Sequence, residues 1–308
     1  MLWPQNAMDA SCAHAAAARA EPAFAAAAAA RHVPQMQALL AQLHAPLACW
    51  LQARQPAQGP LLVGINGAQG AGKSTLCQLL QVVLEAGLGL RVAVLSIDDV
   101  YLTHAERQRL AREVHPLLAV RGVPGTHDVA LAISLLDRLA ALRPGERLAL
   151  PSFDKGRDDR RPPAQWPEVT GPVDIILFEG WCVGASAQPA AALATPINAL
   201  EAEEDADGRW RSYVNAQLQG PYADLFDRLQ RLILLQVPGW EKVHEWRCQQ
   251  EQGLPAEQRM DAEQVRRFIA FYERLTRHML ATLPTQADVC LRLAPDHSIA
   301  AVRLGDRT

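Results

Sequence analysis

From residue 60 onward, short apolar runs alternate with segments whose apolar side chains recur every three or four residues. The runs at 61–66, 91–97, 173–178, 231–237 and 287–293 have the length of buried strands, and 147–150 is a shorter candidate. The segments 76–87, 103–114, 128–142, 240–251 and 261–283 have helical spacing. Strands that alternate with helices form parallel sheets covered on both faces, so the pattern predicts an α/β fold with a mostly parallel sheet.

The first 58 residues lack this alternation. Alanine occupies 14 of the 21 positions from 10 to 30. Because alanine side chains bury little surface, we expect residues 1–35 to form a disordered extension. Leucines at helical spacing predict a helical segment over 36–58, which leads into one domain over 59–308.

The composition excludes several classes of protein. A chain of 308 residues with 49% hydrophobic side chains can bury a core without disulfide or metal staples. A net charge of −3 argues against a broad surface for nucleic acid, and no run of about 18 strongly apolar residues predicts a membrane span. The six cysteines are scattered and form no Cys-x-x-Cys pair, which indicates reduced thiols. Residues 1–9 lack the basic side chains with which a signal peptide begins. We therefore expect a cytoplasmic protein, with no indication of its oligomeric state.

A glycine-rich motif follows the first predicted strand. Its pattern, Gly-x-x-x-x-Gly-Lys-Ser over 67–74, predicts a site for a nucleoside triphosphate. Backbone N–H groups and the start of the next helix would surround the phosphates, Lys73 would bridge the β- and γ-phosphates, and Ser74 would hold Mg²⁺. The predicted nucleotide-binding residues are Gly67, Ala68, Gln69, Gly70, Ala71, Gly72, Lys73, Ser74 and Thr75.

Carboxylates follow two other predicted strands, where ligands of parallel sheets gather. Asp98 is predicted to accept the proton of an attacking hydroxyl, and Asp99 to act as a supporting or metal-linked carboxylate. Glu179 is predicted to bind Mg²⁺ together with Ser74. Helix capping by the aspartates and an ordinary solvated strand end at Glu179 are the structural alternatives.

Three polar segments, at 121–128, 153–161 and 240–247, supply candidates for acceptor binding and charge neutralisation. Arg121 would meet an anion, and Lys155 is one of only three lysines in a chain that otherwise uses arginine. Arg247 would lie over the transferring phosphoryl group and completes the predicted catalytic set with Lys73 and Asp98. Helix capping near 126–128 and a solvated charged loop at 153–161 are the alternatives. The predicted substrate-binding residues are Asp99, Tyr101, Arg121, Thr126, His127, Asp128, Lys155 and Arg160.

Together these motifs resemble those of the plant-type D-glycerate 3-kinase family, P-loop kinases related to uridine, pantothenate and phosphoribulo-kinases. The similarity runs through 64–75, 96–103, 121–128, 153–155, 179–182 and 243–247 and covers about residues 60–295. The resemblance implies a three-layer P-loop NTPase sandwich with a helical C-terminal lid region. It also implies that the protein uses ATP and Mg²⁺ to phosphorylate D-glycerate, a small hydroxy acid, to 3-phosphoglycerate.

Two other functions stay open. One is a P-loop kinase for another hydroxylated acceptor, such as pantothenate or a nucleoside. A nucleoside would call for stacking aromatic side chains, of which the acceptor segments offer only Tyr101 and Phe153. The other is a nucleotide-dependent switch or chaperone ATPase, although the chain lacks the Asn-Lys-x-Asp motif of GTPases. We expect ATP and a small molecule as partners, without nucleic acid or membrane.

Overall fold

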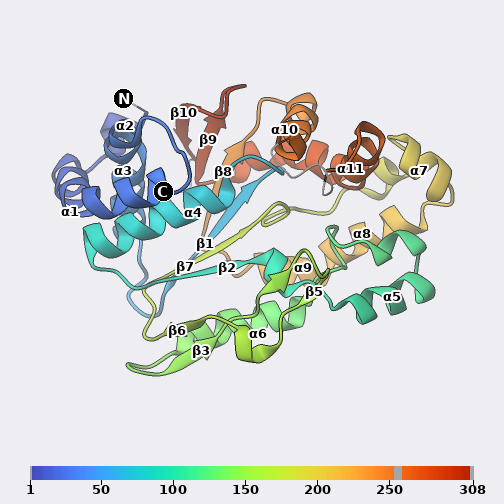
Figure 1. Ribbon diagram of the computed structural model, residues 1–308, viewed down its shortest axis with the longest axis horizontal. Helices are drawn as coiled ribbons and strands as arrows, with labels where there is room; N and C mark the ends of the chain where they lie inside the picture. Colours follow the sequence, from blue (N-terminus) through green and yellow to red (C-terminus); the bar gives the residue numbers. More distant parts are fainter. Residues whose placement is uncertain (1, 253–258, 306–308) are drawn as a thin grey trace.

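The computed structural model describes residues 2–252 and 259–305. A six-stranded sheet with the strand order β10-β9-β8-β1-β7-β2 runs through its centre (Figure 1). All neighbouring strands are parallel except β10 and β9, so the predicted mostly parallel sheet is confirmed. The strands are β1 (Leu61–Gly67), β2 (Val92–Ser96), β7 (Ile175–Gly180), β8 (Arg231–Gln236), β9 (Val289–Leu293) and β10 (Ile299–Leu304).

Helices cover both faces of this sheet, which explains why its strands read as continuous apolar runs. Val63 and Ile65 of β1 belong to the core on one face, whereas Leu62 belongs to the core on the other face. The first core includes the N-terminal helices and α4 (Lys73–Val82). The second includes α6 (Val129–Ala141), α8 (Arg209–Gln219), α9 (Pro221–Phe226) and α11 (Ala262–Gln286). The remaining helices are α5 (His104–Glu113), α7 (Ala199–Glu204) and α10 (Trp240–Gln252).

The alanine-rich stretch is an ordered helix, α1 (Ala10–Ala29), which differs from the expected disorder. Its small side chains let another backbone approach closely. A Cβ atom added at Gly87 would lie 2.8 Å from the carbonyl oxygen of Ala16, and that carbonyl belongs to a fully buried residue. Arg19 donates a hydrogen bond to the carbonyl oxygen of Gly87 at 2.6 Å. The stability of α1 therefore comes from tertiary contact, which composition does not report.

Cys12 of α1 and Cys49 form a disulfide, so the expectation of reduced thiols is wrong for this pair. The two cysteines are 37 residues apart, and packing of α1 against the next helical segment brings them together. No spacing rule predicts such a pairing. The free cysteines of the described residues are Cys77, Cys182, Cys248 and Cys290.

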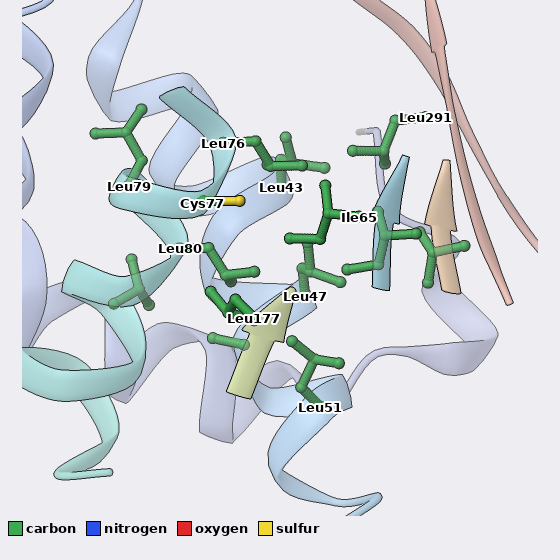
Figure 2. Packing of buried hydrophobic residues seen from close by; sticks show 14 of the residues in the cluster. Leu43, Leu47, Leu51, Ile65, Leu76, Cys77, Leu79, Leu80, Leu177 and Leu291 are labelled. Atoms are coloured by element: carbon green, nitrogen blue, oxygen red, sulfur yellow. The ribbon is translucent and has the colours of Figure 1, made fainter. Parts of the chain in front are cut away.

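The predicted N-terminal helical segment is present as α2 (Met36–Leu39), a π-helical turn (Leu40–His44) and α3 (Ala45–Gln52). Figure 2 shows Leu43, Leu47 and Leu51 of this segment beside the strands that carry Ile65 and Leu177. The same core contains Leu76 and Leu80 of α4, so the segment packs against the helix that follows the glycine-rich loop.

Three helices, α7 to α9, and strand β10 were not predicted. The buried positions of α8 include the polar side chains of Arg211 and Asn215, which interrupt the apolar period. Two small antiparallel pairs of strands, β3 (Arg147–Ala149) with β6 (Glu168–Thr170) and β4 (Phe153–Asp154) with β5 (Asp159–Arg160), lie outside the main sheet. Short 3-10 or π turns occupy Gln5–Ala7, Val83–Gly87, Ile97–Val100, Pro116–Ala119, Pro163–Gln165 and Ala190–Leu193. Among the helices in the described ranges, none has both the length and the apolar character needed to cross a membrane.

Candidate active site

A cavity of about 1270 Å³ opens where the glycine-rich loop, β2 and β7 end. We call it the catalytic cavity. Its wall combines the carboxyl ends of parallel strands with side chains from the loop 153–161 and from α10 and α11. The predicted site residues that line it are Gln69, Gly70, Gly72, Lys73, Ser74, Thr75, Asp98, Tyr101, Arg121, Lys155, Glu179 and Arg247.

The glycine-rich loop has the backbone that its sequence requires. Gly70 and Gly72 have φ angles of 79° and 88°, in the left-handed region that favours glycine. Lys73 begins α4, and its Nζ donates hydrogen bonds to the carbonyl oxygens of Gly67 at 2.8 Å and Ala68 at 3.2 Å. Burial lowers the pKa of Lys73, although the nearby carboxylates partly oppose this shift. A phosphate chain in the loop would supply the negative charge that favours the ammonium form.

Ser74 and Glu179 meet across two elements. The Ser74 hydroxyl donates a hydrogen bond to Glu179 Oε1 at 2.9 Å, and Glu179 is 7% exposed. The parallel register places Glu179 of β7 beside Ile65 of β1, close to the start of the glycine-rich loop. The pair offers the hard oxygen ligands that Mg²⁺ prefers.

The neighbouring aspartates have different surroundings. Asp98 lines the catalytic cavity and forms an ion pair with Lys155, with Oδ2 and Nζ 2.7 Å apart. Burial opposes ionisation of Asp98, but the ammonium outweighs it, so the pKa of Asp98 lies below its usual value. Asp99 does not line the cavity and instead accepts a hydrogen bond from the Phe153 backbone N–H at 3.1 Å. Burial raises the pKa of Asp99 to about 6.

Asp158 fixes the charged loop against the rest of the wall. It adopts a left-handed backbone with φ 55° and forms ion pairs with Arg107 and Arg121. Arg107 is fully buried and also donates to the carbonyl oxygens of Leu102 at 2.8 Å and Ala119 at 3.3 Å. Arg121 lines the catalytic cavity, so Asp158 restrains a cation that faces the site.

Besides Asp99, four other predicted substrate-binding residues, Thr126, His127, Asp128 and Arg160, lie behind the wall rather than in it. The Thr126 hydroxyl donates to the carbonyl oxygen of Val123 at 2.7 Å and accepts from the Gly122 N–H at 3.0 Å. These bonds shape the turn that carries Arg121.

The other three support the same wall. His127 stacks on the Tyr101 ring, with centroids 4.4 Å apart, and its Nδ1 lies 2.6 Å from the Tyr222 hydroxyl. Burial lowers the pKa of His127 to about 4, so the ring is neutral near pH 7. Asp128 caps α6 by accepting from the Leu131 N–H at 3.0 Å, as the structural alternative predicted, and pairs with Arg160 at 3.3 Å.

The Arg247 side chain, which comes from α10, also lines the catalytic cavity. Its guanidinium carbon lies 4.6 Å from the centroid of the Phe268 ring, and it forms an ion pair with Glu251. Glu251 also accepts a hydrogen bond from the Met260 backbone N–H at 2.8 Å. Arg247 is therefore held between α10 and α11.

Several cavity-lining residues were not predicted as site residues. Among them are His104, Asp158, Trp181, Phe268 and Tyr272. The Trp181 N–H donates to the carbonyl oxygen of Gly122 at 2.9 Å, and Tyr272 packs edge-on against Trp181. Trp181 lies inside the matched segment 179–182 and Asp158 inside the charged segment 153–161, but neither was singled out as a site residue.

Comparison with known proteins finds kinases among the relatives of this chain. The chain is 32% identical over 235 residues to the chloroplastic D-glycerate 3-kinase of Arabidopsis thaliana, covering 73% of this chain and 48% of that protein. The chain thus spans about half the length of that relative. It is 30% identical over 262 residues to the kinase mug58 of Schizosaccharomyces pombe, covering 79% of this chain and 91% of that protein.

A solved structure is similar over most of its length. The D-glycerate 3-kinase from Cryptococcus neoformans aligns with a TM-score of 0.66 and 28% identity, covering 83% of this chain and 94% of that one. No family model matches the chain.

Proposed function

Because the chain belongs to the D-glycerate 3-kinase family of P-loop kinases, we propose that it transfers the γ-phosphoryl group of ATP to the primary hydroxyl of D-glycerate. The products are 3-phosphoglycerate and ADP. The observation that carries the proposal is the composition of the catalytic cavity. Its lining includes Lys73 of the glycine-rich loop, the carboxylate of Asp98, and the cations Lys155 and Arg121.

The glycine-rich loop binds the triphosphate through its backbone N–H groups, with the N-terminus of α4 adding its dipole. Ser74 and Glu179 are the residues that would hold Mg²⁺, and their hydroxyl and carboxylate oxygens suit that ion. When bound, Mg²⁺ neutralises charge on the β- and γ-phosphates.

The acceptor lies between Asp98 and the cations. Its carboxylate meets Arg121 and Lys155, which line the same cavity. In the free protein Lys155 pairs with Asp98 and lowers its pKa. When Lys155 turns to the acceptor carboxylate, the base strength of Asp98 increases because its counter-ion is now shared.

Transfer proceeds in line. The acceptor hydroxyl oxygen forms a bond to the γ-phosphorus as the bond from that phosphorus to the β–γ bridging oxygen breaks. Asp98 takes the hydroxyl proton, and ADP keeps the bonding electron pair. Lys73 and Arg247 stabilise the negative charge that spreads over the transferring oxygens, as both line the cavity.

The predicted substrate-binding residues behind the wall act as positioning residues. Thr126 holds the turn of Arg121, His127 supports the Tyr101 ring, and Arg160 ties its loop to Asp128 by an ion pair. Asp99 anchors the backbone of Phe153, two residues before Lys155.

Aromatic side chains in the cavity favour a small acceptor over a nucleoside. Trp181 and Tyr272 also line the cavity, but they are 4% and 6% exposed. They pack edge-on against each other with ring centroids 4.9 Å apart. Because both rings are buried, neither offers the open face on which a nucleoside base stacks.

The experiment that tests this proposal is ADP release from Mg-ATP with and without D-glycerate, with the product isomer identified by ³¹P NMR. L-glycerate, pantothenate and uridine serve as alternative acceptors, and Lys73→Ala as the inactive control. Strong stimulation by D-glycerate with 3-phosphoglycerate as the product is expected. Stimulation only by another acceptor would overturn the choice of substrate, and acceptor-independent hydrolysis would instead support a nucleotide-dependent switch.

A further inference from the structure

Glu251 lies in the last turn of α10 and is 4% exposed. This place is unfavourable for a carboxylate for two reasons. Burial removes the charge from water, and the C-terminal end of a helix presents the negative end of the helix dipole. A carboxylate in such surroundings is costly unless a cation and hydrogen-bond donors compensate it, so the contacts of Glu251 indicate its role.

Each carboxylate oxygen of Glu251 accepts a hydrogen bond from a different part of the chain. Oε1 accepts from Nη2 of Arg247, one helical turn earlier, and the two side chains form an ion pair. Oε2 accepts from the Met260 backbone N–H at 2.8 Å. Met260 lies two residues before α11 begins at Ala262, so Glu251 joins the end of α10 to the residues that lead into α11.

Both donors belong to the wall of the catalytic cavity. Arg247 and Met260 line it, and so does Phe268 of α11, whose ring centroid lies 4.6 Å from the guanidinium carbon of Arg247. Glu251 stands behind this wall. A guanidinium has five N–H donors, so Arg247 can pair with Glu251 and also donate to a phosphoryl oxygen in the cavity.

The middle of α10 is anchored by other contacts. Trp246, which precedes Arg247 in the chain, is 1% exposed, and its indole N–H donates to the carbonyl oxygen of Pro295 at 3.1 Å. Its ring stacks on that of His297, with centroids 4.0 Å apart. α10 also packs against α11 (Figure 1). These contacts do not involve Glu251, so we expect the helix to stay in place when the charge of Glu251 is removed.

Stability alone does not account for the ion pair. Replacing a buried ion pair by apolar side chains of similar volume often leaves a fold equally stable or more stable, because the two charges no longer have to leave water. What only the charged pair supplies is a guanidinium that is held at the wall of the catalytic cavity.

We propose that Glu251 is a positioning residue for phosphoryl transfer, which holds the Arg247 guanidinium where negative charge spreads over the transferring oxygens. The inference rests on the proposed role of Arg247 and deepens it, because it assigns the orientation of that cation to a side chain behind the cavity wall. The charge that Arg247 stabilises develops in the transition state. Loss of its orientation therefore lowers kcat rather than the affinity for ATP or the acceptor.

The test is a double-mutant cycle on the acceptor-dependent turnover of the full chain with Mg-ATP. The variants are Arg247→Ala, Glu251→Gln and the combination of the two. Glutamine keeps an oxygen that accepts from the Met260 N–H, so Glu251→Gln removes the charge that pairs with Arg247 and retains that hydrogen bond. Glu245→Gln is the matched control, because Glu245 belongs to the same helix and its side chain is 51% exposed.

Arg247→Ala is expected to lower kcat by about 10²–10³-fold and Glu251→Gln by about 10–100-fold, with KM values changed by less than about twofold. The double variant should be no slower than Arg247→Ala, because Glu251 acts through the guanidinium. Glu245→Gln should keep the native kcat. Urea unfolding curves are measured in parallel, since a merely structural contact would lower the free energy of unfolding and leave the kcat of the folded enzyme unchanged.

Two results would overturn the inference alone. One is a native kcat in folded Glu251→Gln. The other is a double variant that is slower than Arg247→Ala by the full factor that Glu251→Gln shows by itself. If Glu251→Gln does not fold, Glu251→Asp takes its place. It keeps the carboxylate but draws it back by one methylene, so its kcat should fall, and an unchanged kcat would overturn the inference.

The remaining outcomes separate this inference from the proposed function. A native kcat in Arg247→Ala would overturn the role of Arg247 and this inference with it, while acceptor-dependent transfer by the native chain would still support the kinase proposal. Absence of acceptor-dependent ADP release by the native chain would overturn the kinase proposal and this inference together.

Discussion

Replacement of Asp98 by asparagine is the sharpest test of the proposed base. Asparagine keeps the shape of the side chain but removes its charge and its ability to take the hydroxyl proton. Burial by itself would raise the pKa of Asp98, but Oδ2 of Asp98 lies 2.7 Å from Nζ of Lys155. This ion pair outweighs the effect of burial and keeps the pKa of Asp98 below its usual value. The native carboxylate is therefore ionised throughout the neutral range, and the substitution removes a functional base.

Two magnitudes follow from the structure. Loss of a general base lowers turnover by about 10²–10⁴-fold, which corresponds to about 3–5 kcal/mol in the activation barrier. The side chains of Asp98 and Lys155 are 29% and 63% exposed, so their ion pair contributes at most about 1 kcal/mol to stability. Because the pKa of Asp98 is lowered on folding, that contribution exists above the ordinary pKa of the carboxyl group and is lost as the pH falls through the lowered value. Turnover is thus expected to fall far more than stability.

Asp99→Asn is the matched control, since the asparagine side-chain oxygen still accepts the hydrogen bond from the Phe153 N–H. The assay is the acceptor-dependent turnover number of both variants, with urea unfolding curves measured in parallel. We expect Asp98→Asn to be folded and nearly inactive, and Asp99→Asn to keep most of its turnover. Equal turnover by the two folded variants would refute the assignment of Asp98 as the base.

Three further predictions concern stability. Burial raises the pKa of Asp99 to about 6, so ionisation of Asp99 costs stability above that pH and the cost disappears below its ordinary pKa. Asp99→Asn should therefore stabilise the fold by up to about 3 kcal/mol at pH 8 and by less at pH 4. Chemical unfolding of both proteins at the two pH values measures this, and a larger stabilisation at pH 4 than at pH 8 would contradict the prediction. Gly122 has φ 139°, and a Cβ atom there would overlap the Tyr272 hydroxyl oxygen. Gly122→Ala should lower the free energy of unfolding, measured by thermal melts, by about 2 kcal/mol or more. Gly59 has φ 73° and no atom within 4 Å of an added Cβ, so Gly59→Ala should lower the free energy of unfolding by less. Cys12→Ser opens a loop closed over 37 residues and should destabilise the fold by about 2–4 kcal/mol. Dithiothreitol should destabilise the native chain by a similar amount and leave the stability of the Cys12→Ser variant unchanged. A native chain whose stability does not change with dithiothreitol would argue against a stabilising disulfide.

Features that depend on neighbouring residues in the chain could be predicted from the sequence. The run at 61–66 followed by glycines and Lys73 predicts a strand, a phosphate loop and a helix, because apolar periodicity and left-handed glycine conformations are local properties. The positions of Asp98 and Glu179 at strand ends placed both at the same edge of a parallel sheet, and both line the catalytic cavity. The resemblance of the motifs to those of a known family predicted the kind of reaction, phosphoryl transfer from ATP.

Contacts between distant segments were decided only by the tertiary structure. Thr126, His127 and Asp128 belong to a motif that predicted substrate contact, yet they lie behind the wall. The Tyr101 ring stands in front of His127, and Thr126 and Asp128 are bound in a turn and a helix cap. Arg247 and Phe268 come together because two helices pack against each other, which no local pattern reports.

The N-terminal part of the chain shows the same difference between local sequence features and contacts made only in the folded chain. Alanine-rich composition by itself predicts weak burial, since each side chain removes little surface from water. The close approach of α1 to Gly87 and the Cys12–Cys49 disulfide both require the folded chain. The sequence thus determined the sheet, the phosphate loop and the class of chemistry through local periodicity and spacing. Only three-dimensional packing decided which side chains face the catalytic cavity, because burial and hydrogen-bond partners are set by residues far apart in the chain.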